Sequence, residues 1–205
     1  KKRRVCGAFF DRREVWLVKA EMTPEPVRRS ALRLRLGGLV LCWRRRLLWH
    51  TGGLRFARPR PEVECLYLWA EHATPLLRRL RGEDMALQRS KVTNLRLAAA
   101  RLDGLTLKPG ETLSFWRAVG RPTRRRGYVE GMILRNGRVA SGVGGGLCQM
   151  TNLLYWMTLH TPLTVTERWR HGYDVFPDSN RTQPFGSGAT CFYNYMDLMV
   201  RNDTP

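Results

Sequence analysis

Residues 127–160, GYVEGMILRNGRVASGVGGGLCQMTNLLYWMTLH, decide the fold because they hold a hairpin signal, a glycine run and a helix signal in immediate succession. Asn136 and Gly137 lie between two short apolar runs, and Asn-Gly is the favoured two-residue turn of an antiparallel hairpin. After the glycines, residues 147–160 are long enough and apolar on enough faces to form a buried helix, which Pro162 ends. This order predicts strands that pack against a central helix.

The segments on either side predict the same fold class. Residues 74–102 carry leucines at largely helical intervals, which predicts one or two helices. Residues 109–115 hold a Pro-Gly turn before alternating apolar positions, and residues 163–169 and 189–202 are β-rich by propensity and alternation. We therefore expect a single mixed α+β domain with a central helix at about residues 147–160 packed on β-strands.

The charge divides the chain into two parts. The 205 residues contain 36 Lys and Arg against 17 Asp and Glu, a net charge of +19, and residues 1–60 alone contribute 17 basic and 4 acidic residues. This basic part ends near Pro59 and Pro61, which bias the backbone away from helix and indicate a linker. The sequence thus predicts a basic, partly helical lead-in over residues 1–64 and a folded domain over residues 65–205.

The basic charge predicts an anionic partner. Residues 31–49 mix arginines with apolar side chains, including Trp43 and Trp49, a pattern typical of a helix on an anionic membrane surface. Nucleic acid is the weaker partner, since no zinc-finger spacing, RNA-binding aromatic signature or helix-turn-helix accompanies the charge. No apolar run is long enough to span a bilayer, and charged residues 11–14 interrupt a signal peptide. We expect a cytoplasmic protein that can lie at the inner membrane face, although the arginine excess could also be purely compositional.

The cysteines and histidines do not predict a metal site or a cofactor. The five cysteines are widely spaced and never form a Cys-x-x-Cys pair: Cys6, Cys42, Cys65, Cys148 and Cys191. Such spacing argues against a zinc knuckle or a disulfide framework and favours a reducing compartment. We therefore expect no metal and no cofactor.

The glycine run and the residues after it predict a functional site. Three consecutive glycines stand directly before the predicted helix: Gly144, Gly145 and Gly146. They allow positive φ and a close approach of backbone to a ligand. Cys148 would occupy the first helical turn, where the helix dipole stabilises a thiolate. Gln149 could donate to an oxyanion, and Asn152 lies one turn further on the same side. The alternative is that Cys148 is a small buried apolar residue.

These motifs resemble the VanW family. The resemblance is carried by GVGGGLCQMTNLLYW, then by ERWRHGYDVFP, RTQPFGSGAT and FYNYMDLMVRN, and upstream by KVTNLRLA, PGETLSFW and GRPTRRRGYVEGM. It covers residues 89–202. It implies an accessory role in glycopeptide resistance and a link to peptidoglycan or its precursors, because many relatives are joined to wall-binding modules. Relatives usually have Asp where this chain has Gly188, so no role is carried over for that carboxylate.

A second group of polar residues follows the predicted central helix. Its members are Glu167, Arg168, His171 and Asp174. His171 could act as the general base for Cys148, with Asp174 or Asp178 fixing its tautomer. The order of cysteine, helix, strand and histidine is that of papain-like enzymes, an analogy from order alone. The alternative is that His171 is a polar loop residue and that Glu167 and Arg168 form an ion pair with each other.

Two further functions stay open at this point. Glu167 could be a general acid or base acting on a sugar, with Arg168 and Trp169 shaping a groove for a lyase or hydrolase. Alternatively, the glycine loop could bind a carboxylate or phosphate through its backbone amides, as a binding module without catalysis. All three hypotheses share one partner, a peptidoglycan fragment or precursor.

Overall fold

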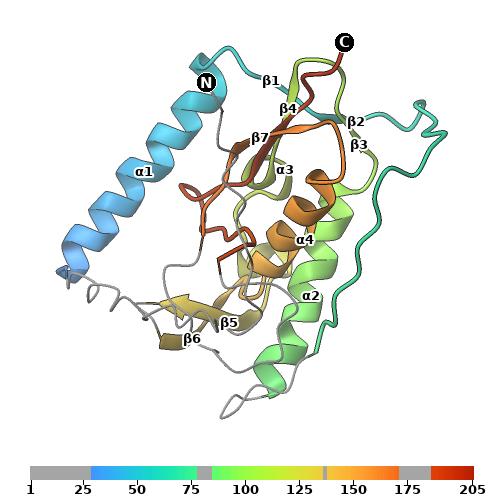
Figure 1. Ribbon diagram of the computed structural model, residues 1–205. Helices are drawn as coiled ribbons and strands as arrows, with labels where there is room; N and C mark the ends of the chain where they lie inside the picture. The colour runs from blue at the N-terminus through green and yellow to red at the C-terminus, as the bar shows by residue number, and fades with distance from the viewer. Residues whose placement is uncertain (1–28, 78–84, 136–137, 171–185) are drawn as a thin grey trace, which may run out of the picture.

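The computed structural model describes residues 29–77, 85–135, 138–170 and 186–205 (Figure 1). Helices and short strands are interspersed along these residues, which confirms the predicted α+β class. The elements follow in the order α1 (Ala31–Thr51), β1 (Arg55–Phe56), β2 (Arg58–Pro59), α2 (Met85–Leu102), β3 (Leu105–Thr106), β4 (Glu111–Ser114), α3 (Phe115–Val119), the 3-10 turn η1 (Arg124–Arg126), β5 (Glu130–Arg135), β6 (Arg138–Val143), α4 (Cys148–Thr158), β7 (Thr164–Glu167) and β8 (Met199–Arg201).

The main sheet has four strands in the order β1-β4-β8-β7. β1 runs parallel to β4, whereas β8 runs antiparallel to both of its neighbours, β4 and β7. The last strand of the chain is therefore an interior strand of the sheet, and Met199 and Val200 within it are buried. Since every pairing in this sheet joins distant parts of the sequence, the sheet forms only when the whole domain folds.

The predicted hairpin and central helix are both confirmed. β5 and β6 pair antiparallel with Arg135 opposite Arg138, so two residues remain for the connecting loop, as the Asn-Gly signal predicts. α4 begins at Cys148 and contributes the buried residues Thr151, Tyr155 and Thr158. α4 contacts both α2 and β7 and lies beside α2 in Figure 1.

Two predicted strands differ from the observed structure. The strand that starts after the Pro-Gly turn ends at Ser114, because the Ser114 hydroxyl accepts a hydrogen bond from Arg117 N at 3.2 Å and starts α3. Phe115 is therefore a fully buried helical residue. Residues 189–198, predicted to be β-rich, form only isolated bridges, because residues 193–195 make a turn in which Tyr195 N and Met196 N both donate to Phe192 O at 3.1 Å.

The predicted linker around Pro59 and Pro61 belongs to the folded domain. β1 and β2 precede residue 65, yet β1 pairs with β4 and β2 pairs with β3. Arg60 forms an ion pair with Glu111, with Nη2 and Oε1 2.6 Å apart. Pro59 is accommodated because it lies in a two-stranded sheet, where a strand tolerates the missing N–H at its edge. β1 and β2 thus pair with strands that lie after residue 65.

The hydrophobic core lies between α2, α3, α4 and β8. Its buried members are Leu95, Ala98, Phe115, Trp116, Val119, Tyr128, Leu147, Tyr155, Ala189, Cys191, Leu198 and Val200. α1 is different, because nearly all of its side chains are exposed and it lies at the edge of the molecule, across from α2 (Figure 1). The core therefore supports the turn before α4, and α1 packs against the core through Trp49.

Asn94 on α2 holds the glycine turn in place. Its Nδ2 donates to Val129 O at 3.0 Å and to Gly145 O at 2.9 Å, and its Oδ1 accepts from Val129 N at 2.9 Å. The side chain is fully buried. Val129 N and Gly145 O thus depend on this one amide.

We expect Asn94→Ala to lower the free energy of unfolding by about 2 kcal/mol, because Val129 N and Gly145 O lose the partner that Asn94 supplies, whereas Val129 O keeps its hydrogen bond from Gly144 N. Thr93→Ala, an exposed change on the same helix, is the matched control and should change stability by about 0.5 kcal/mol or less. Urea denaturation of both variants measures the difference. Equal stability of the two variants would contradict this role of Asn94.

Candidate functional site

The glycine turn before α4 requires its glycines for steric reasons. Gly144 and Gly146 have φ of +79° and +91°, in the left-handed region that side chains disfavour. A Cβ on Gly145 would lie 2.1 Å from the carbonyl carbon of Gly131 on β5. The sequence predicts that the backbone of this turn can approach a ligand closely. In the structure, the backbone of the turn closely approaches β5.

Two of the amides in this turn are already used within the protein. Gly144 N donates to Val129 O at 3.0 Å, and Gly145 N donates to Gly142 O at 3.0 Å. In this conformation these two N–H groups are not available to a carboxylate or phosphate. A bulky replacement of Gly145 would also clash with β5, so it cannot serve as a clean probe of ligand binding.

Cys148 is the first residue of α4 and is only partly buried. Thr190 Oγ1 donates to its sulfur at 3.2 Å, and the Cys148 thiol donates to Cys191 O at 3.4 Å. The sulfur of Cys191 lies 4.0 Å from that of Cys148. Cys148 thus packs at the margin of the core while remaining in part accessible, at the helix start that the sequence predicts.

Gln149 and Asn152 both contact other parts of the chain. Gln149 Nε2 donates to Thr74 Oγ1 at 3.1 Å and to Pro75 O at 3.2 Å. Asn152 Oδ1 accepts from Ala189 N at 3.2 Å. The segment before α2 therefore occupies the amide of Gln149, and Asn152 attaches α4 to the C-terminal segment.

Arg168 fixes the C-terminal segment against α4. Its Nε and Nη2 donate to Gly188 O at 3.0 and 2.9 Å, and Nη2 also donates to Gly186 O at 2.7 Å. Its guanidinium carbon lies 4.4 Å from the ring centroid of Tyr155. A Cβ on Gly188 would be 1.8 Å from Asn152 Oδ1, so this position has no room for a side chain.

The structure therefore brings three of the predicted site residues, Cys148, Asn152 and Arg168, around residues 186–191. His171 and Asp174, the predicted base and its orienting carboxylate, lie outside the described residues.

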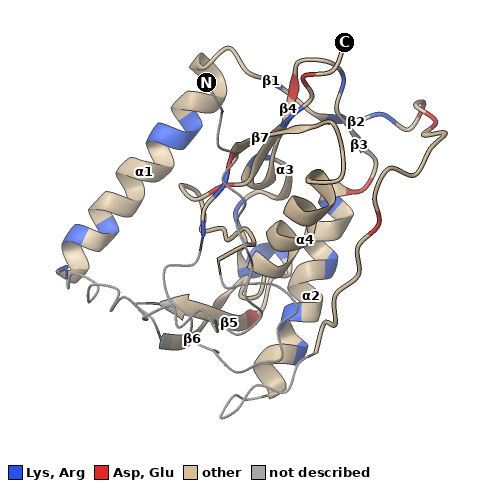
Figure 2. Cartoon of the chain, in the orientation of Figure 1, with Lys and Arg blue, Asp and Glu red and all other residues tan. Residues whose placement is uncertain are grey.

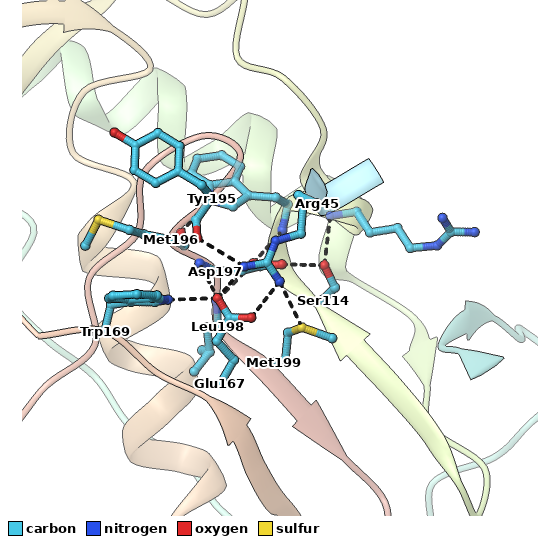
Figure 3. A network of polar contacts seen from close by, with 11 residues as sticks. Arg45, Ser114, Glu167, Trp169, Tyr195, Met196, Asp197, Leu198 and Met199 are labelled. Carbon is cyan, nitrogen blue, oxygen red and sulfur yellow. Dashed lines mark hydrogen bonds and ion pairs between the residues drawn. The ribbon is translucent and has the colours of Figure 1, made fainter. Parts of the chain in front are cut away.

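Glu167 belongs to a different cluster, drawn in Figure 3. Both of its carboxylate oxygens accept from the guanidinium of Arg45, each at 2.5 Å. Trp169 Nε1 donates to Oε1 at 2.8 Å, and Asp197 N donates to the same oxygen at 3.1 Å. The ionic partner of Glu167 is thus Arg45 on α1, and the predicted pairing with Arg168 is wrong.

Arg45 and Asp197 are the members of this cluster that sequence reasoning missed. Arg45 is only 8% exposed, and its Nη2 also donates to Tyr195 O at 3.1 Å. Asp197 is fully buried, and its carboxylate accepts from Ser114 Oγ at 2.5 Å and Trp116 N at 3.0 Å. Arg45 is the middle residue of the run RRR, in which both of its neighbours are exposed, so the local sequence does not indicate that Arg45 is buried.

Burial raises the pKa of Asp197 to about 6. The hydrogen bonds from Ser114 and Trp116 and the charge of Arg45 act in the opposite direction, whereas the charge of Glu167 acts with burial. Loss of water around a carboxylate therefore outweighs its donors here.

Within residues 29–77, 85–135, 138–170 and 186–205, no cluster of three or more His, Cys, Asp or Glu could hold a metal ion. Over the same residues, none of the helices combines the length and the apolar character needed to cross a bilayer.

The fold and the site define a class of small α+β domains in which a triple-glycine turn leads into a helix that starts with cysteine. Residues 90–205 match the family described as VanW like protein, and since this is more than half of the chain, the protein belongs to that family.

Two curated relatives share long stretches with it. The chain is 43% identical over 152 residues to the vancomycin B-type resistance protein VanW of Enterococcus faecalis, a match that covers 74% of this chain and 55% of the relative. It is 35% identical over 114 residues to the uncharacterized protein YoaR of Bacillus subtilis, covering 56% of this chain and 36% of YoaR. The chain thus spans about half the length of the first relative and less of the second. No solved structure matches it.

We expect Asp197 to make the native state less stable as pH rises. Its carboxyl is protonated in both states at low pH, but above its raised pKa of about 6 the folded state must hold a buried charge. The stability difference between wild type and Asp197→Asn should therefore fall by about 3 kcal/mol from about pH 4 to pH 7.

Urea denaturation across this pH range measures that difference. Asp203→Asn is the control, because exposed Asp203 pairs with Arg201, which lowers its pKa and gives a small change of opposite sign. A difference for Asp197→Asn that stays constant or grows with pH would contradict the prediction.

Proposed function

We propose that this protein has an accessory role in glycopeptide resistance and acts on peptidoglycan peptides or their precursors through the thiol of Cys148. The observation that carries the proposal is the position of this thiol, which is partly accessible at the start of α4 behind the glycine turn. A helix start favours the thiolate, the nucleophilic form of cysteine. Family membership and the name of the enterococcal relative support the link to glycopeptide resistance.

In the proposed reaction Cys148 loses its proton to His171, and the sulfur bonds to the carbonyl carbon of a wall peptide. Asp174 orients His171. The C–N bond then breaks, the leaving amine takes the proton from His171, and water hydrolyses the thioester to release the acid and the free thiol.

The path of the chain after β7 supports His171 as the base. Trp169 O accepts from Thr190 N at 2.9 Å, and Thr190 Oγ1 in turn donates to the sulfur of Cys148. His171 follows Trp169 by two residues, and two residues of extended chain span at most about 7 Å. The described chain just before His171 therefore lies close to the thiol of Cys148.

The contact of Gln149 with Pro75 favours a peptide over a sugar as substrate. Gln149 is the residue directly after the nucleophile Cys148. Its Nε2 already donates to a peptide carbonyl, that of Pro75. A substrate carbonyl that replaced Pro75 O would receive the same donor. Gln149 then stabilises the oxyanion that develops when the sulfur attacks.

The contacts of Glu167 weigh against the alternative of a glycan lyase or hydrolase. Both of its oxygens accept from Arg45, and Oε1 also accepts from Trp169 and from Asp197 N. A general acid must bring a proton to its substrate, and these donors occupy the positions at which a proton would sit. The internal bonds of Gly144 and Gly145 weigh in the same way against a binding module built on their amides.

We also propose that α1 lies on the anionic inner surface of the membrane, which makes the protein a peripheral cytoplasmic one. Exposed apolar side chains occur along the whole helix: Leu32, Leu34, Leu36, Leu39, Val40, Leu41, Trp43, Leu47 and Leu48. Figure 2 shows basic positions along α1 and no acidic ones. Apolar area and cationic charge on one helix fit the boundary between anionic headgroups and acyl chains.

For the thiol mechanism, we expect Cys148→Ser and His171→Ala each to reduce processing of wall peptides by about 1,000-fold or more, with little further loss in the double variant. Cys65→Ser is the matched control at an exposed cysteine and should keep full activity. The measurement is mass spectrometry of muropeptides and lipid-linked precursors incubated with each folded variant. Activity that survives Cys148→Ser would overturn the mechanism, and no product from the wild type would favour a binding module.

For the membrane surface, we compare two double variants with the same change of net charge. Arg33→Ser with Arg35→Ser removes charge from α1 and should weaken binding to vesicles that contain phosphatidylglycerol by about tenfold or more at low salt. Arg96→Ser with Arg101→Ser removes exposed charge from α2 and should have little effect. Vesicle sedimentation measures both, and equal losses would move the attraction from α1 to the whole domain.

A further inference from the structure

Cys148 and Cys191 lie next to each other although 42 residues separate them in the sequence. Their sulfurs are 4.0 Å apart, and the Cys148 thiol also contacts Cys191 O at 3.4 Å. Thr151 Oγ1 donates to Ala189 O at 3.2 Å and so holds the same two segments together one turn further along α4. The two segments that carry the sulfurs are thus joined by hydrogen bonds at Cys148 and at Thr151.

We propose that Cys148 and Cys191 are a redox pair that closes a reversible intramolecular disulfide, and that this bond masks the thiol of Cys148. A disulfide has its sulfurs about 2.05 Å apart, so the sulfurs, now 4.0 Å apart, must approach by about 2 Å before the bond closes. The masking rests on the proposed function of Cys148, whereas the formation of the bond does not.

The two cysteines differ in a way that sets the order of events. Cys148 is partly accessible, whereas Cys191 is buried within the core cluster. Burial raises the pKa of Cys191 well above its usual value, and its hydrogen bond to Cys148 adds to this effect. Cys191 therefore remains a protonated thiol that solvent reagents cannot reach, and Cys148 must react first.

The oxidant is a disulfide, either a small one such as oxidised glutathione or one in another protein. The thiolate of Cys148 attacks one sulfur of the oxidant, forms a mixed disulfide and releases one thiolate, which takes up a proton. Cys191 then gives up its proton, and its thiolate attacks the Cys148 sulfur, breaks the mixed disulfide and displaces the second thiolate, which takes up a proton. Two thiols of the protein are oxidised and one disulfide is reduced to two thiols.

The test treats the reduced 205-residue chain with oxidised glutathione, blocks remaining thiols with an alkylating reagent and maps peptides without reduction. We expect a linked pair of peptides containing Cys148 and Cys191, lost again on treatment with a dithiol reductant. Alkylation of Cys148 in the oxidised protein should slow by about tenfold or more. Cys65→Ser is the matched control and should give the same linked pair.

Cys191→Ala keeps a small apolar side chain in the core and removes the second thiol. In this variant Cys148 should accumulate as the glutathione mixed disulfide. If the variant fails to fold, the peptide map of the wild type decides by itself. Cys148 and Cys191 that both remain free, or a wild-type Cys148 that stays bound to glutathione, would overturn the redox pair.

The same samples separate this inference from the proposed function. Wall-peptide processing is measured on the reduced protein, then after oxidation, then after re-reduction, and we expect activity, loss and recovery. A linked pair in a protein that is inactive even when reduced would support the bond and overturn the proposed function. Activity in a protein that forms no linked pair would support the proposed function and overturn the disulfide. Unchanged activity in the linked protein would overturn the masking of Cys148.

Discussion

A buried carboxylate, Asp197, is the group on which the arrangement of the sheet depends. Its oxygens accept from Ser114 and from Trp116 N, which lie where β4 passes into α3, and its own N–H donates to Glu167 at the end of β7 (Figure 3). Glu167 in turn holds Arg45 of α1. One polar network therefore fixes both neighbours of β8 and the N-terminal helix. The loss of water around Asp197 raises its pKa, and the hydrogen bonds from Ser114 and Trp116 and the charge of Arg45 offset only part of that cost.

The end of β7 separates the structural part of the molecule from the candidate site. Glu167 is the last residue of β7 and Arg168 follows it directly, yet the two side chains contact different parts of the molecule. Glu167 joins the buried network with Arg45, whereas Arg168 holds residues 186–188 against α4. A charged residue close to a nucleophile is a natural candidate for a catalytic role. The contacts of Glu167 and Arg168 instead hold segments of the fold together. The chemistry we propose needs only the thiol, a base and the amide of Gln149.

Local signals in the sequence predicted the elements that depend on local interactions. The hairpin follows from Asn-Gly between apolar runs, and α4 follows from glycines before an apolar segment, because turn geometry and helix periodicity act over a few residues. The contacts of Arg45 and of Cys191 could not be predicted in this way, since each depends on a partner more than forty residues away. The positions of β1 and β2 could not be predicted either, because a strand of two residues is too short to show an alternating pattern.

The first turn of α4 is the place where the folded protein and its proposed substrate compete. Thr74 and Pro75 occupy the amide of Gln149, and Cys191 lies against the thiol of Cys148. A substrate carbonyl can receive the Gln149 donor only when it displaces Pro75 O, and it can receive the sulfur only while Cys148 is reduced. Access to the site therefore has two independent conditions, one on the conformation of residues 74–75 and one on the redox state of the cysteines. Since the glycine turn and Asn94 hold the start of α4 rigidly against β5, neither condition requires the helix itself to move.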